Sequence, residues 1–372
     1  MVDSPPFRAD HVGSLLRPMR LLQARADLAD GRMDDPEQLR RIEDDAIREA
    51  VALQERVGLR SATDGEFRRA SWHMDFIYQL GGVHQADERL TVHFHNEQGD
   101  LEFQSALRVD GRVTLDQLIF ADAFAFLGSV TTTAVPKLTI PSPSMVHYRG
   151  GRAAIDDAVY PDLDGFWDDL SAAYAAEVQG LGRLDCTYLQ FDDTSLAYLN
   201  DPVQRDLIAG LGGDPEHQHE RYIRQINAAL RVRPGGMRVT THMCRGNFRS
   251  SWVAEGGYDF VAEALFNDLE VDGFFLEYDD ARSGGFEPLR FVPKGKRVVL
   301  GLVTTKRGEL EDKDDLKRRI DEAARFVPLD QLCLSGQCGF ASTMEGNNLT
   351  FEQQEAKLRL IVETAAEVWG DS

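Results

Sequence analysis

The sequence has little that would suit a secreted or membrane protein. Its 372 residues include only four cysteines, too few for a disulfide scaffold, so we expect a reducing compartment in which they act as thiols or thiolates. The first residues, Met1 to Pro6, lack the basic start and apolar run of a secretory signal. No stretch approaches the roughly 18 apolar residues that span a membrane. We therefore expect a cytoplasmic protein without a membrane partner.

Positive charge is also scarce. The chain has 62 acidic residues against 41 lysines and arginines, a formal net charge of -21. Such a chain repels nucleic acid and anionic lipid, so we expect neither as a main partner. A hydrophobic content of 42% is ample for a full core. The composition predicts a globular protein, and it leaves both a monomer and a homo-oligomer open.

Short apolar segments alternate with longer helical patterns along most of the chain. We expect eight strands, over residues 10–15, 59–65, 136–140, 187–192, 237–242, 273–277, 297–303 and 331–335. Helical periodicity fills the gaps, for example over residues 35–54 and 313–326. Eight such strands predict a (β/α)8 TIM barrel, and we expect residues 1–372 to form one barrel domain.

Residues 84–118 interrupt this alternation. Apolar and polar residues alternate with a period of two over residues 90–95 and again over 101–103. This period is typical of strands, so we expect an inserted β-hairpin or small sheet. We assign the insertion to the barrel domain rather than to a domain of its own.

A histidine and a cysteine lie at the end of the fifth expected strand. In an extended chain His242 and Cys244 point to the same side. Imidazole and thiolate together suit zinc, although a buried histidine and an inert core cysteine would give the same pattern. Cys338 follows the last strand in a glycine-flanked loop, on the face that carries the active site of such barrels. We interpret Cys338 as a ligand, and Cys186 and Cys333, which lie in strands, as core residues.

An acidic residue ends the sixth expected strand. Glu277 closes an apolar segment, and it is either a metal ligand or the first member of a solvated acidic run with Asp279 and Asp280. The carboxyl ends of barrel strands meet around one mouth, which would bring Glu277 close to His242 and Cys338. This convergence favours the ligand.

The four candidate ligands define the predicted chemistry. Zinc held by His242, Cys244, Glu277 and Cys338 would carry a net negative charge, which makes it a poor generator of hydroxide. Such a centre is better suited to holding an added thiol, with an ordinary pKa of about 8.5, as a reactive thiolate at neutral pH. We therefore predict Zn2+ as the cofactor and transfer of an alkyl group to a small thiol.

Taken together, these motifs resemble those of the cobalamin-independent methionine synthase family, in particular its short, single-barrel members. The matching segments lie at residues 7–14, 63–66 and 190–193, followed by the His-x-Cys, Glu277 and Cys-Gly-Phe elements. The resemblance implies the same four zinc ligands. It also implies methyl transfer to a thiol such as homocysteine, from methyltetrahydrofolate or another methyl donor.

The resemblance further implies where an amino-acid substrate binds. Its contacts fall on Val12, Gly13 and Ser14, and on Glu66 and Asp192, whose carboxylates can pair with an α-ammonium group. A structural ion pair with a neighbouring arginine is the alternative role for the two carboxylates. We expect substrate binding.

The position of Lys306 departs from the family's pattern. Where methionine synthases have a histidine proposed to protonate the folate nitrogen, this chain has Lys306. Lysine, with an ordinary pKa of about 10.4, is a poor acid at pH 7 unless its surroundings lower that value. We predict catalytic roles for Lys306 and Asp192, and Lys306 could instead bind an anionic group of the substrate. Four arginines near the motifs could receive carboxylates or be solvated: Arg68, Arg69, Arg245 and Arg249.

Other functions stay open at this stage. A zinc-dependent epoxide:thiol alkyltransferase would keep the thiolate and change the electrophile, with Lys306 and the arginines holding an anion. A metal-free, decarboxylase-like lyase would use Asp64, Asp192 and arginines. A non-catalytic binding barrel would leave the reactive groups at the strand ends without a role.

Overall fold

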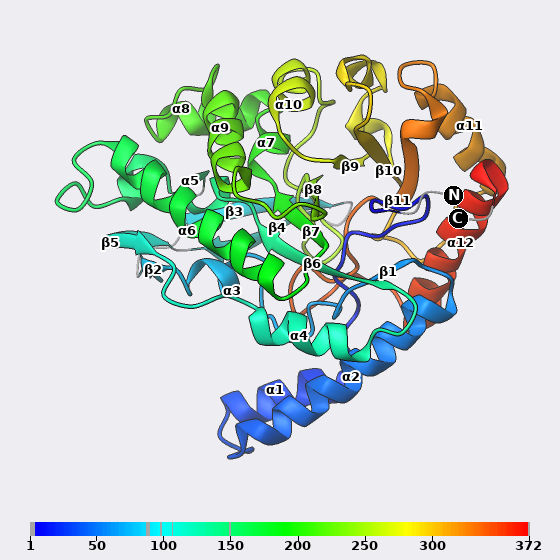
Figure 1. The fold of residues 1–372 in the computed structure, drawn as a ribbon, viewed down its shortest axis with the longest axis horizontal. Helices are drawn as coiled ribbons and strands as arrows, with labels where there is room; N and C mark the ends of the chain where they lie inside the picture. The colour runs from blue at the N-terminus through cyan, green and yellow to red at the C-terminus, as the bar shows by residue number, and fades with distance from the viewer. Residues whose placement is uncertain (1–3, 87–89, 97–98, 106, 149, 371–372) are drawn as a thin grey trace.

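The core of the fold is a curled parallel sheet of seven strands, which has the arrangement of the (β/α)8 TIM barrel that the sequence predicts. Figure 1 shows the sheet among its helices. The computed structural model describes residues 4–86, 90–96, 99–105, 107–148 and 150–370. Seven strands pair in parallel in the order β1-β6-β7-β8-β9-β10-β11. Their bounds are β1 Ser61–Ala62, β6 Val135–Pro141, β7 Tyr188–Asp193, β8 Arg238–Met243, β9 Gly273–Glu277, β10 Arg297–Val303 and β11 Leu332–Gly336.

The N-terminal segment closes the barrel in place of its first strand. Ala9 bridges to β11 in parallel, and the amide of Leu15 donates to the turn after β1. The prediction of a regular strand over residues 10–15 is wrong, and β1 is shorter than expected. The Asp10 carboxylate accepts the N–H of His11 at 2.8 Å, a local bond that competes with strand pairing.

Helices surround the sheet (Figure 1). Their bounds are α1 Met19–Ala29, α2 Pro36–Arg56, α3 Met74–Ile77, α4 Ala121–Val130, α5 Ser144–Tyr148, α6 Leu163–Arg183, α7 Ser195–Tyr198, α8 Pro202–Gly210, α9 Gln218–Leu230, α10 Ala262–Asp268, α11 Lys313–Ala323 and α12 Phe351–Trp369. Caps fix several starts: the Asp35 carboxylate accepts the N–H of Glu37 in α2, and Thr350 with Gln353 forms a capping box on α12. No helix in these described ranges is long and apolar enough to cross a membrane.

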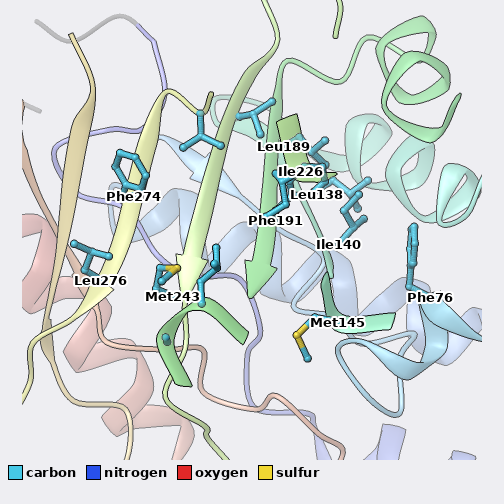
Figure 2. Packing of buried hydrophobic residues seen from close by; sticks show 14 of the residues in the cluster. Phe76, Leu138, Ile140, Met145, Leu189, Phe191, Ile226, Met243, Phe274 and Leu276 are labelled. Atoms are coloured by element: carbon cyan, nitrogen blue, oxygen red, sulfur yellow. The ribbon is translucent and has the colours of Figure 1, made fainter. Parts of the chain in front are cut away.

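The two faces of each strand contact different parts of the protein. Leu138 and Ile140 of β6 and Leu189 and Phe191 of β7 are buried outside the sheet, where they pack beside Ile226 of α9 (Figure 2). The residues between them point into the barrel, because successive side chains of a strand lie on opposite faces. Apolar packing therefore fixes the outside of the barrel, whereas the interior combines polar groups with a small apolar cluster of Val12, Phe275, Val299 and Cys333.

A buried polar network lies inside the barrel near the amino ends of β1, β6 and β7. The Asp10 carboxylate accepts hydrogen bonds from the Tyr188 hydroxyl at 2.8 Å and from Ser61 Oγ at 2.8 Å, and the Lys137 ammonium lies 3.3 Å away. Both charged side chains are fully buried. Burial alone would raise the pKa of Asp10, but Lys137 and the bonds from His11 and Tyr188 outweigh it and hold the pKa below its usual value.

The expected insertion is confirmed as two small antiparallel sheets. β2 (Gly81–His84) pairs with β5 (Arg108–Thr114), and β3 (Leu90–Asn96) pairs with β4 (Gly99–Ser105) in a hairpin. The hairpin is joined to the barrel, since the backbones of His95 and Trp252 exchange hydrogen bonds of 2.6 and 2.9 Å. This contact places β3 beside the loop that follows β8.

Glu177 of α6 gives the stability a dependence on pH. Its buried carboxylate accepts the N–H of Ile119 at 3.0 Å, and burial raises its pKa to about 8. Because the folded pKa lies above the unfolded value of about 4.3, the linked stability is full below that value and is lost as pH rises through about 8. The loss amounts to at most about 1.4 kcal/mol per pH unit.

Glu177→Gln keeps the acceptor and removes the titration. We therefore expect the free energy of unfolding of the variant, measured by urea denaturation, to gain steadily on that of the wild type between about pH 5 and about pH 8. Parallel curves for the two proteins over this range would contradict the assignment.

Candidate metal centre and substrate pocket

Neighbouring strands carry the four predicted ligands to one end of the barrel. His242 lies near the end of β8, with Cys244 directly after it, and Glu277 is the last residue of β9. Cys338 lies two residues beyond β11, and all four side chains are buried. The carboxyl ends of the parallel strands thus bring together residues almost a hundred positions apart.

The ligand atoms form a compact group. One atom from each of His242, Cys244, Glu277 and Cys338 lies within 4.8 Å of all the others. The two sulfurs are 3.6 Å apart, close to the separation of about 3.8 Å that tetrahedral zinc imposes with bonds of about 2.3 Å. Neither ring nitrogen of His242 has a hydrogen-bond partner among the described residues. The donor set and its spacing suit a zinc ion.

The electrostatics of the group favour one thiolate. The sulfurs of Cys244 and Cys338 lie within hydrogen-bond distance, and this contact holds the pKa of Cys338 well below its usual value and that of Cys244 well above. Burial raises the pKa of Glu277 to about 7, against the opposing charges of Lys306 and His242. Cys244, Glu277 and Cys338 are thus buried side by side, and ionising all three at once is unfavourable unless a cation lies between them.

A pocket with about 610 Å3 of empty space, part of it open to solvent, lies against this group. Strand-end residues, the loops after β1, β8 and β11, and the inserted hairpin all contribute to its wall. The lining residues are Val12, Ser14, Glu66, Trp72, His73, Phe94, Asp192, Thr194, Tyr198, His242, Cys244, Gly246, Asn247, Phe248, Cys338, Gly339, Ser342 and Thr343.

Two buried carboxylates face the pocket beside the ligand group. Glu66 Oε1 accepts a bond of 2.8 Å from Thr139 and lies 3.6 Å from Arg69, whereas Oε2 has no partner among the described residues. Burial raises the pKa of Glu66, and burial together with the charge of Glu66 raises that of Asp192 to about 7. A cationic group in the pocket would relieve both carboxylates.

The predicted contacts at residues 12–14 lie close to these carboxylates, since a Cβ on Gly13 would be 3.8 Å from Glu66 Oε1. Val12 and Ser14 line the pocket, and the carbonyl of Val12 accepts a bond of 2.7 Å from Gln190. Gly13 has a φ of +148°, and a Cβ there would come within 2.8 Å of Thr139 Cγ2. Only glycine therefore lets this segment pass close to β6 and present its neighbours to the pocket.

Lys306 is not one of the residues that line the pocket in the described part of the chain. It is buried, and its ammonium lies 3.8 Å from Asp279. Burial alone would lower its pKa, but the charges of Asp279, Glu277 and Cys338 outweigh it and hold the pKa above its usual value. A lysine with a raised pKa is a weaker acid, which counts against proton donation at neutral pH.

The arginines near the motifs are mostly engaged within the protein. Arg68 pairs with Asp44 at 2.6 Å, and Arg69 is buried beside Glu66. Arg245 donates to the backbone carbonyls of Gly256 and Glu277 and to the Tyr258 hydroxyl. These three side chains position the site rather than offer a free guanidinium to a substrate.

Arg17, which the sequence did not single out, ties two site loops together. Its buried guanidinium donates to the carbonyls of Glu66 and Arg69 at 2.9 and 3.0 Å. It also donates to the carbonyls of Ala341 and Thr343 at 3.0 and 2.9 Å. The loop that carries Glu66 and the loop that carries Cys338 are thereby held as one unit.

The sequence also missed the aromatic part of the pocket wall. Trp72, Phe94, Tyr198 and Phe248 come from loops, a short helix and the insertion, where no strand-end pattern marks them. A partial signal was available for Phe248, which follows the His-x-Cys motif closely. The rings of Phe94 and Phe248 lie 5.4 Å apart, so the hairpin covers one side of the pocket.

Phe94→Ala should open the pocket to solvent. After a chelator treatment, we expect iodoacetamide to modify Cys244 and Cys338 several-fold faster in the variant, because the lost ring uncovers two buried thiols. Peptide mass spectrometry would measure the rates. Cys186 and Cys333, buried in the core, serve as internal controls; equal acceleration at all four thiols would indicate general loosening instead.

Comparisons with known proteins agree with this geometry. Residues 139–367 match the family described as "Cobalamin-independent synthase, Catalytic domain". The chain is 49% identical over 366 residues to the uncharacterized protein YxjG of Bacillus subtilis, covering 98% of this chain and 95% of that protein.

Two solved structures are similar over nearly the whole chain. The putative vitamin-B12 independent methionine synthase of Listeria monocytogenes is 38% identical, with a TM-score of 0.79 and 99% of each chain covered. A B12-independent methionine synthase of Shewanella sp. W3-18-1, solved with selenomethionine, has a TM-score of 0.71 at 20% identity and 97% coverage of each chain, a likeness of fold. The chain belongs to the cobalamin-independent methionine synthase family, a family of methyltransferases, through its catalytic domain.

Proposed function

We propose that this protein transfers a methyl group to the sulfur of a small amino thiol such as homocysteine, using a zinc ion held by His242, Cys244, Glu277 and Cys338. The observation that carries the proposal is the convergence of the four ligand atoms within 4.8 Å. Methyltetrahydrofolate or another methyl donor supplies the methyl group. A zinc ion bound there would keep the acceptor sulfur a thiolate at neutral pH.

The chain's own residues would bind and orient the acceptor. Glu66 and Asp192, two buried carboxylates on one pocket wall, suit the α-ammonium of an amino acid. Val12 and Ser14 line the same space, and the Gln190 amide joins the carbonyl of Val12 to the Asp192 carboxylate. With the ammonium group fixed, the sulfur of a homocysteine-like thiol is directed to the ligand group.

The same carboxylates disfavour the epoxide:thiol alkyltransferase whose substrate carries an anionic group, because they would repel that group. Lys306 would not relieve that repulsion, since it pairs with Asp279 and does not line the described pocket. We assign to Lys306 the supply of positive charge near Glu277 and Cys338. Asp192 then serves the substrate's ammonium group rather than a proton transfer.

We further propose that residues 1–372 act as one barrel domain. The site draws Val12, Ser14 and Glu66 from the N-terminal part of the chain and its candidate ligands from the C-terminal part. Neither part alone would hold both the ammonium group and the metal.

Removal of one ligand tests the metal site. Cys338→Ser should lower both the zinc content, measured by inductively coupled plasma mass spectrometry, and the formation of methionine from homocysteine and methyltetrahydrofolate. Since even changes behind metal ligands cost about 10- to 100-fold, we expect a loss of activity greater than about 100-fold. Cys333→Ala in the same segment is the matched control and should keep its zinc. A Cys338→Ser protein with full zinc content and activity would contradict the assignment.

The ammonium site has its own test. Glu66→Gln removes a charge-assisted contact, for which about 1.5–3 kcal/mol is typical, so KM for homocysteine should rise by roughly 10- to 100-fold. Zinc content should not change. The deaminated analogue 4-mercaptobutanoate should bind the two proteins alike, and an equal loss for both thiols would rule out recognition of the ammonium group by Glu66.

A further inference from the structure

A second histidine lies in the pocket outside the ligand group. His73 is buried at the start of α3 and lines the pocket beside Trp72. Its amide carbonyl accepts bonds from Phe76 and Ile77, so its backbone belongs to the first turn of the helix. The ring is therefore carried by an ordered element.

The segment before His73 is fastened to the loop that carries Cys338. Trp72 N donates to Ser342 O at 3.1 Å, and Met344 N donates to Ala70 O at 3.1 Å. Ser71 and Thr343 form an antiparallel bridge between these two bonds. On the loop itself, Ser342 Oγ lies 3.9 Å from the sulfur of Cys338. The imidazole and the ligand group are thus held in a fixed relation.

The contacts of the imidazole with Ser71 and Trp72 help to orient it. Its Nδ1 lies 3.1 Å from Ser71 Oγ, and its ring stacks on Trp72 with centroids 4.4 Å apart and an interplanar angle of 33°. Asp75 accepts the N–H groups of Ala70 and Ser71 and so stabilises the turn that carries Ser71. Since Nδ1 is directed to Ser71, Nε2 is the nitrogen through which the ring can reach a molecule in the pocket.

The proposed reaction needs a proton at this place. When a methyl or alkyl group leaves a nitrogen or oxygen atom, that atom keeps the electron pair and is strongly basic unless it is protonated. Lys306 is not among the described residues that line the pocket. Glu66 and Asp192 line it, but the proposed function assigns them to the α-ammonium of the acceptor. Imidazole is the side chain that most often serves as a general acid in enzymes.

We propose that His73 is a catalytic residue that donates a proton to the leaving atom of the alkyl donor. The inference rests on the proposed function and names a residue for one of its steps. The acceptor sulfur forms a bond to the alkyl carbon while the bond from carbon to the leaving nitrogen or oxygen breaks. The electron pair of that bond stays on the leaving atom, which takes a proton from the imidazolium form of His73. The ring is left as neutral imidazole, and water returns a proton to it.

Two alkylating reagents that differ in their leaving groups can show whether His73 donates a proton or only supports the structure of the pocket. Propylene oxide leaves an alkoxide that needs a proton, whereas methyl iodide leaves iodide, which needs none. We would measure alkylation of homocysteine by the zinc-loaded protein with each reagent, for the wild type and for His73→Asn. The asparagine amide can keep the contact with Ser71 and cannot act as the acid. His84→Asn, at an exposed histidine of β2, is the matched control.

We expect His73→Asn to slow the reaction with propylene oxide by about 100-fold or more, the usual contribution of a general acid, and to leave the reaction with methyl iodide within about twofold. Equal slowing with both reagents, or no slowing with either, would overturn the inference while leaving thiol activation intact. A wild-type protein that accelerates neither reaction would overturn the proposed function, and the role of His73 with it.

Discussion

The barrel depends on the carboxylate of Asp10. It accepts the N–H groups of Phe7 and His11 and the hydroxyls of Ser61 and Tyr188, and it lies beside the ammonium of Lys137. These partners belong to the N-terminal segment, β1, β6 and β7, so one buried charge joins the closing segment to the sheet. A buried carboxylate is costly unless every oxygen is satisfied, and here the Lys137 charge and the hydrogen bonds meet that requirement.

The same segment connects closure of the barrel to the site. Val12 and Ser14 follow Asp10 directly, and Gln190 of β7 bonds to the carbonyl of Val12 while its side chain also reaches Asp192. Along β7, Tyr188, Gln190 and Asp192 share the inner face because their spacing is two. The alternate residues of β7 pack on the helices outside. Along the interior, Tyr188 bonds to Asp10, Gln190 bonds to Val12, and Asp192 is the carboxylate that the proposed function assigns to the substrate.

Much of this was predictable from the sequence, and for a physical reason. Parallel strands end at one face, so a reactive residue at a strand end, such as His242 or Glu277, can be placed near others without knowing the loops. The alternation of polar and apolar residues likewise predicted the insertion. The prediction of a regular first strand was wrong because the Asp10 carboxylate accepts the N–H of His11, which a regular strand would use for pairing. Lys306 shows the other limit, since its partner Asp279 is set by tertiary packing that no local pattern encodes.

Arg17 gives the pocket a further property. Its four hydrogen bonds join the loop of Glu66 to the loop of Cys338, so the distance between the two ends of the pocket is set by a rigid brace. On the proposed function, one end holds the amino group of the acceptor and the other holds its sulfur. If both ends are engaged at once, the fixed span makes the length of the acceptor's carbon chain a determinant of binding, separate from the chemistry of its two end groups.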